Sequence, residues 1–96
     1  MVEIRQTAVF SAWLAALRDE RAQARIAQRL RYLGMGDFGD VQSVGAGVSE
    51  LRVHYGPGYR VYFVKRGLEI VILLCGGDKS TQDRDIKTAH QLAREV

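Results

Sequence analysis

Residues 50–63 read ELRVHYGPGYRVYF, and this stretch decides the fold. Apolar and polar side chains alternate on both sides of Gly56-Pro57-Gly58, which is typical of two strands joined by a tight turn. We therefore predict a β-hairpin whose strands cover residues 48–55 and 59–66.

The polar side chains of this hairpin are predicted to share one face of the sheet, because side chains alternate along a strand. If the apolar side chains face the helices, the opposite face is open. It carries Arg52, His54, Arg60 and Tyr62. A loop at residues 56–58 would give this arrangement and would place His54 opposite Arg60. Turn chemistry instead favours Pro57-Gly58 at the centre of a type II turn, which shifts the pairing by one residue. We favour the first register because a one-residue shift would expose every apolar side chain, and a β-bulge would reconcile the two.

The segments around the hairpin predict an α+β domain. Periodicity and capping residues indicate a strand at 2–6, two helices within 7–33 that separate near Asp19 or Glu20, a short strand near 41–44, a buried central strand at 69–75, and a final helix capped by Ser80 or Thr81. One long bent helix is the alternative to the two helices. The order is β-α-α-β-β-β-α, over a single domain of residues 1–96. We expect a small, mostly antiparallel sheet with the N-terminal helix pair and the C-terminal helix packed on one face.

Composition fits a small domain with one core. The chain has 96 residues, a net charge of +3 and 47% apolar residues. The single cysteine, Cys75, allows no internal disulfide, which favours the reducing cytoplasm. The longest apolar run, at residues 70–75, is far shorter than the ~20 residues that span a bilayer. Two histidines and one cysteine without ligand spacing predict no metal site, and no motif predicts a cofactor.

Lys79 is placed where the end of a strand and the start of a helix can bind an anion. It follows residues 76–78, at the end of the buried strand and the start of the final helix. The two glycines there would let backbone N–H groups approach an anion, and a helix N-terminus adds favourable potential. A plain turn is the alternative for such a glycine pair.

Two further groups of arginines are candidates for binding a phosphate backbone. Arg52 and Arg60 would repel each other across the hairpin unless an anion lay between them, or unless each paired with Glu50 or Glu69 or reached water. A helical stripe consists of Arg18, Arg21, Arg25 and Arg29. This stripe suits RNA or an acidic partner, and the alternative is a face that simply contacts solvent.

Four blocks of the sequence resemble one family of toxins. They are Phe10-x-x-Trp13-Leu14-x-x-Leu17-x-Asp19, Gly45-x-Gly47-Val48-x-Glu50-Leu51-Arg52, Gly56-Pro57-Gly58-Tyr59-Arg60-Val61-Tyr62-Phe63 and Gly76-Gly77-Asp78-Lys79-Ser80-Thr81-Gln82-x-x-Asp85-Ile86. They are similar to the phage-related addiction module killer protein branch of the RelE/HigB toxins, within the RelE/ParE superfamily. The resemblance covers nearly the whole chain. It implies a RelE-like fold and a type II toxin, a small bacterial endoribonuclease that is usually ribosome-dependent.

The resemblance also implies the partners. A cognate antitoxin, typically a small helix-turn-helix protein encoded beside the toxin, would hold the chain inactive. The other partners would be mRNA and the ribosome, with no membrane and no metal.

The resemblance also implies roles for individual residues, at the positions where this sequence matches the motifs of the family. Arg60 resembles the strand arginine that contacts the scissile phosphate, and Arg52 resembles a basic residue of the preceding strand. Lys79 takes the place of a basic residue that stabilises the transition state. The tyrosine that some members carry in the C-terminal helix is missing here, and Asp83 or Asp85 occupies that region.

Residue chemistry assigns the remaining roles. In metal-independent cleavage the RNA 2′-hydroxyl attacks the adjacent phosphorus, and a base must remove its proton. His54 is the candidate base because histidine titrates near neutral pH, and Lys79 with a lowered pKa is the alternative. Tyr62 is predicted to stack on an RNA base, and Arg25 and Arg29 to contact RNA.

Two other functions fit the same pattern. A ParE-like toxin would poison DNA gyrase instead of cutting RNA, although such proteins generally lack the cations at positions 52, 60 and 79. A catalytically inactive basic module that binds RNA or protein is the second alternative.

Overall fold

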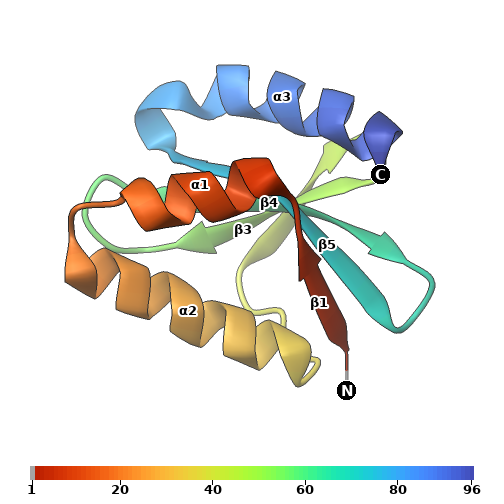
Figure 1. Ribbon diagram of the computed structural model, residues 1–96, viewed down its shortest axis with the longest axis horizontal. Coiled ribbons are helices and arrows are strands. Elements are labelled where there is room, and N and C mark those ends of the chain that lie inside the picture. The colour runs from red at the N-terminus through yellow and green to blue at the C-terminus, as the bar shows by residue number, and fades with distance from the viewer. Residues whose placement is uncertain (1) are drawn as a thin grey trace.

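A five-stranded sheet lies between two helical layers in the computed structural model, which describes residues 2–96 (Figure 1). The elements in chain order are β1 (Glu3–Gln6), α1 (Ala8–Ala16), α2 (Glu20–Gly34), β2 (Val41–Gly45), β3 (Val48–Val53), β4 (Tyr59–Arg66), β5 (Ile70–Asp78), a single 3-10 turn η1 (Lys79–Thr81), and α3 (Gln82–Glu95). Across the sheet the order is β1-β5-β4-β3-β2, with β1 parallel to β5 and the other neighbours antiparallel. The predicted α+β class is confirmed, and the strand predicted near 41–44 is β2.

The helices cover both faces of the sheet, which corrects the expectation that all of them pack on one face. Side chains of α1 and α2 pack on one face against β3, β4 and β5, around Phe10, Ile26 and Phe63. The helix α3 covers the opposite face, where its Ala89 meets a second apolar cluster that includes Tyr62. That second cluster exists because β3, β4 and β5 carry apolar side chains on both faces, and burying each such side chain contributes about 1.5–3 kcal/mol.

Side-chain caps fix where the first two helices begin. The Thr7 hydroxyl accepts a hydrogen bond from the Phe10 amide at 3.0 Å, as the sequence predicts. The Asp19 carboxylate accepts from the Arg21 amide at 2.9 Å, so the predicted break near Asp19 is confirmed. Among residues 2–96, no helix is both long and apolar enough to cross a membrane.

The hairpin pairs Arg52 with Arg60, so the prediction of His54 opposite Arg60 is wrong. The last pair is Val53 with Tyr59, and the loop is therefore longer than the one predicted at 56–58. The Gly58 amide donates to the Tyr55 carbonyl at 3.1 Å, which centres the turn on Gly56 and Pro57 and excludes the alternative centred on Pro57-Gly58. Because the shift moves Arg60 by two positions, from His54 to Arg52, the faces of the strands are preserved.

The glycine pair predicted as an anion cradle or a turn lies inside β5. Gly76 pairs with Val61 and Gly77 pairs with Arg60. A Cβ atom at Gly76 would overlap the Trp13 ring, and one at Gly77 would overlap the Asp85 carboxylate. The two glycines therefore make room for side chains that approach the central strand from opposite sides.

Burial protects the one thiol of the chain. Desolvation, followed by the negative charge of Asp85, raises the pKa of Cys75 to about 12, so the neutral thiol is retained well above neutral pH. We expect a thiol reagent at pH 8 to modify Cys75 very slowly in the folded protein and rapidly in concentrated guanidinium chloride. Absorbance with a chromogenic disulfide measures both rates, and equal rates would contradict this burial.

Candidate active site

A hollow of about 430 Å³ opens beside the tip of the β3–β4 hairpin. Its lining includes all four residues that the sequence nominates for catalysis: Arg52, His54, Arg60 and Lys79. The remaining lining comes from the hairpin loop at residues 55–58. Side chains from β3, from β4 and from η1, which follows β5, thus converge on one place, although they are separated by up to 27 positions in the chain (79 − 52).

The sheet register positions the two arginines. Arg52 and Arg60 are direct partners on neighbouring antiparallel strands, so their side chains leave the same face side by side. Gly77 is the next residue in this row, on β5. Lys79 follows two residues later and approaches the hairpin loop, where a Cβ on Gly58 would lie 3.6 Å from the Lys79 Cβ.

Arg60 is the most enclosed of the four. Its side chain is only 11% exposed, and its Nε is buried without a hydrogen-bond partner. Within residues 2–96 its two Nη atoms make no hydrogen bond, and neither of them is fully buried. The Nη groups therefore keep access to the hollow, where they can bind an anion.

Glu50 lies beneath both arginines and is fully buried. Its Oε1 accepts from Arg52 Nε at 3.1 Å and is 3.8 Å from Arg60 Nε. Its Oε2 accepts from the Tyr62 hydroxyl at 3.0 Å and from Gln82 Nε2 at 2.8 Å. From the sequence, Glu50 was predicted only as a possible ion-pair partner of the arginines. Alternation along β3 puts Glu50 on the same face as Arg52, and this is the signal that could have identified its central place.

Tyr62 does not face solvent, in contrast to the prediction that it lies on an open face and stacks on an RNA base. Its side chain is fully buried beneath α3 and belongs to the cluster that contains Ala89. Desolvation and the hydrogen bond to Glu50 raise the pKa of Tyr62 far above its ordinary value. Tyr62 is therefore a neutral hydrogen-bond donor to Glu50 at every pH of interest.

His54 sits at the rim of the hollow and pairs with a carboxylate. Its Nε2 lies 2.5 Å from Oδ2 of Asp40, just before β2. The hydrogen bond to His54 holds the pKa of Asp40 below its usual value, so Asp40 is ionised at neutral pH. An imidazole that donates Nε2–H to a carboxylate has Nδ1 available to accept a proton. Asp40 was not identified from the sequence, because it meets His54 only once β2 and β3 have paired.

Two of the predicted RNA-binding arginines occupy different environments. The Arg29 guanidinium donates to the carbonyls of Arg52 at 2.5 Å and Phe38 at 3.1 Å, so it fastens α2 to β3 and to the chain before β2. Arg25 is exposed and lies 5.0 Å from the centre of the Tyr55 ring. A cation on that ring borders the hollow, which Tyr55 helps to line.

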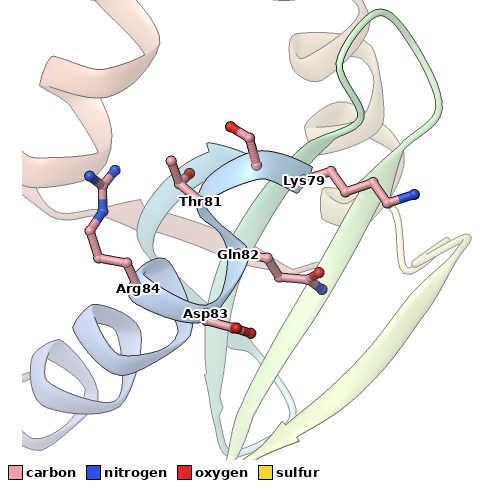
Figure 2. A pocket seen from close by; sticks show the side chains of 6 residues that line it. Lys79, Thr81, Gln82, Asp83 and Arg84 are labelled. Atoms are coloured by element: carbon pink, nitrogen blue, oxygen red, sulfur yellow. The ribbon is translucent and has the colours of Figure 1, made fainter.

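The first turn before α3 presents Lys79 to solvent. Figure 2 shows Lys79 and Arg84 extending to opposite sides of this turn. Asp78 caps the turn, since its carboxylate accepts from the Ser80 amide at 2.8 Å. Thr81 is the N-cap residue of α3, one of the two positions predicted, but its hydroxyl donates to Asp85 Oδ2 at 2.5 Å and makes no capping hydrogen bond.

The two aspartates in the region of the missing tyrosine differ in exposure. Asp83 is exposed and lines a hollow with Lys79 and Arg84. Asp85 is 7% exposed, accepts from Thr81, and has Arg84 Nε 3.5 Å from its Oδ1. Asp85 is thus tied into the packing of α3 on Gly77.

Comparisons with known proteins give a relative and a family for the chain. The chain is 50% identical over 95 residues to an uncharacterized protein of Haemophilus influenzae, an alignment that covers 99% of this chain and 96% of the relative. Residues 12–95 match the family described as phage-derived protein Gp49-like (DUF891). This match takes in both arginines of the hollow, Lys79, and the whole of α3. The chain therefore belongs to the phage-derived Gp49-like family, a family associated with toxin–antitoxin modules.

Proposed function

We propose that the chain is the toxin of a type II toxin–antitoxin module and cuts mRNA on the ribosome. The observation that carries this proposal is the convergence of Arg52, Arg60 and Lys79, with His54, on one solvent-open hollow. Three cations from separate elements suit a phosphodiester that gains negative charge as it is cleaved. Membership of the Gp49-like family supports the role of toxin.

The chemistry requires no metal in this proposal. The 2′-oxygen of the RNA bonds to the adjacent phosphorus, the bond from phosphorus to the 5′-oxygen breaks, and a cyclic phosphate forms. His54, oriented by Asp40, takes the proton of the 2′-hydroxyl. The leaving 5′-oxygen takes up a proton from water in the open hollow. Arg60 and Lys79 stabilise the charge on the phosphorane, and Arg52 binds the backbone of the RNA.

The products distinguish this reaction from hydrolysis by a metal-activated water. Attack by the 2′-hydroxyl leaves a cyclic phosphate or 3′-phosphate on one fragment and a 5′-hydroxyl on the other. We expect fragments from programmed ribosomes to be labelled by polynucleotide kinase without prior dephosphorylation, and mRNA with a 2′-O-methyl group at the cut site to resist cleavage. Fragments that begin with a 5′-phosphate would contradict the proposed chemistry.

Induced expression tests the class of toxin. We expect the rate of protein synthesis to fall before the rate of DNA synthesis. Pulse labelling with an amino acid measures the first rate, and pulse labelling with thymidine measures the second. An early DNA-damage response would instead favour a gyrase poison, and normal growth would favour an inactive basic module. Co-purification with the product of an adjacent reading frame tests the antitoxin, and its absence for both neighbouring frames would count against a two-component module.

A further inference from the structure

We infer that Glu50 is a positioning residue that holds Arg52 and Arg60 in the orientation needed to bind the reacting phosphate. The inference rests on the proposed ribonuclease function, and it assigns a role to a group that touches no substrate. Glu50 has no exposed surface, and its carboxylate lies beneath the hollow, not in its lining. It therefore acts through the two arginines.

The two carboxylate oxygens have separate tasks. Oε1 is shared by the arginines, with Arg52 Nε at 3.1 Å and Arg60 Nε at 3.8 Å. Oε2 accepts only neutral donors, from Tyr62 and Gln82. These two donors come from β4 and from the first turn of α3, so the carboxylate is fixed from two directions and cannot rotate toward either arginine alone.

The buried carboxylate of Glu50 offsets the repulsion between the two arginines. Arg52 and Arg60 are direct cross-strand partners, and two like charges at such a position repel each other. One buried carboxylate between and beneath them offsets this repulsion before any RNA is bound. A buried carboxylate in turn needs charged and neutral donors around it, and here it has both.

The point of attachment on Arg60 matters for its function. Glu50 approaches the side of this guanidinium at Nε, while the Nη groups remain without a protein partner in residues 2–96. An arginine whose Nε side faces a buried carboxylate presents its outer edge, with the two Nη groups, to an incoming phosphate. The Nε of Arg60 is buried and makes no hydrogen bond, so at 3.8 Å its interaction with Glu50 Oε1 is an electrostatic attraction.

Glu50→Gln tests the inference, because it keeps the shape of the side chain and removes its charge. The matched control is Glu69→Gln, which removes the same charge from an exposed position between β4 and β5. We expect Glu50→Gln to lower kcat for ribosome-bound mRNA by about 100-fold, the effect of a small misplacement of a reacting group. Binding of a 2′-O-methyl mRNA should stay equal or become tighter, since one negative charge has been lost. Glu69→Gln should change neither quantity.

A purely structural role would give a different result. In that case Glu50→Gln would lower the melting temperature while the folded fraction kept the kcat of the original chain, and the inference would be overturned. A rise in kcat would overturn it too, because Glu50 would then only weaken the positive potential of the hollow. Tyr62→Phe removes one donor to Oε2 and leaves the carboxylate in place, so its kcat should fall much less.

A second measurement keeps the inference separate from the proposed function. Nitrogen NMR follows the Nε–H groups of Arg52 and Arg60 without any RNA. We expect slowly exchanging, rigid signals in the original chain and faster exchange in Glu50→Gln, whether or not the chain cuts RNA. If the original chain cuts no RNA but the NMR change is seen, the ribonuclease function fails and the positioning contact stands. Unchanged signals would refute the positioning contact by itself.

Discussion

Replacing Arg60 by alanine is expected to lower mRNA cleavage by roughly two to three orders of magnitude, the usual cost of removing one donor that stabilises transition-state charge. The side chain is 11% exposed, so its guanidinium acts where water screens charge poorly. Its free Nη groups are the donors that the reacting phosphate would lose. Single-turnover cleavage of mRNA on purified ribosomes measures the effect.

Two controls separate this loss from unfolding. Arg66→Ala removes the same type of side chain from the other end of β4, where Arg66 donates to the carbonyls of Ala93 and Val96 outside the hollow. It should leave the cleavage rate unchanged. Arg60→Lys retains a charge but loses the planar fork, so we expect a rate between those of Arg60→Ala and the original chain. Full activity of a folded Arg60→Ala variant would remove Arg60 from the site.

Gly77→Ala is expected to cause the largest loss of stability among conservative substitutions in the sheet. The added Cβ would overlap the carboxylate of Asp85, which is buried and accepts from the Thr81 hydroxyl at 2.5 Å. The new methyl group must displace Asp85 and with it the first turn of α3. Overpacking of this kind costs about 1–3 kcal/mol in the free energy of unfolding. For a chain of this size we expect a fall of roughly 4–8 °C in melting temperature for each kcal/mol.

Gly34→Ala is the matched control, because the nearest atom to its added Cβ is Ile4 Cδ1 at 3.5 Å, an ordinary contact. Urea unfolding followed by circular dichroism compares the variants. A double variant, Gly77→Ala with Asp85→Ala, should recover part of the loss if the clash is its cause. Equal stability of Gly77→Ala and Gly34→Ala would show that Asp85 moves aside at no cost.

Local pattern was enough to predict the faces of the hairpin strands, since alternation depends only on the chain itself. The alternation correctly placed Arg52 and Arg60 on one face of the sheet. The position of Lys79 near them followed from the motif at the end of the buried strand. Pattern was not enough for the register, because the loop closed by the Gly58 amide and the Tyr55 carbonyl differs from the turn that Pro57-Gly58 suggests.

Contacts between segments that are distant in the chain account for the site features that were not predicted from the sequence. Glu50 meets Gln82 across 32 positions, and the His54 pair with Asp40 exists only in the folded sheet. The role of Gly77 depends on a side chain of α3 that faces it after folding. Tyr62 was assigned to an open face because its strand pattern carries no information about the amphipathic helix that covers it.

The pairing of β1 with β5 has a consequence for how the chain is made. Glu3 lies beside Ile70, so the first strand has no neighbour until residues 70–78 have been synthesised. The same late segment, β5, lies between β1 and β4, and Gln82 follows it after the short turn η1. Long-range pairings of this kind close late and slowly. The cluster of Arg52, Arg60 and Lys79 therefore cannot assemble on a growing polypeptide until β5 and the residue that follows it have been synthesised.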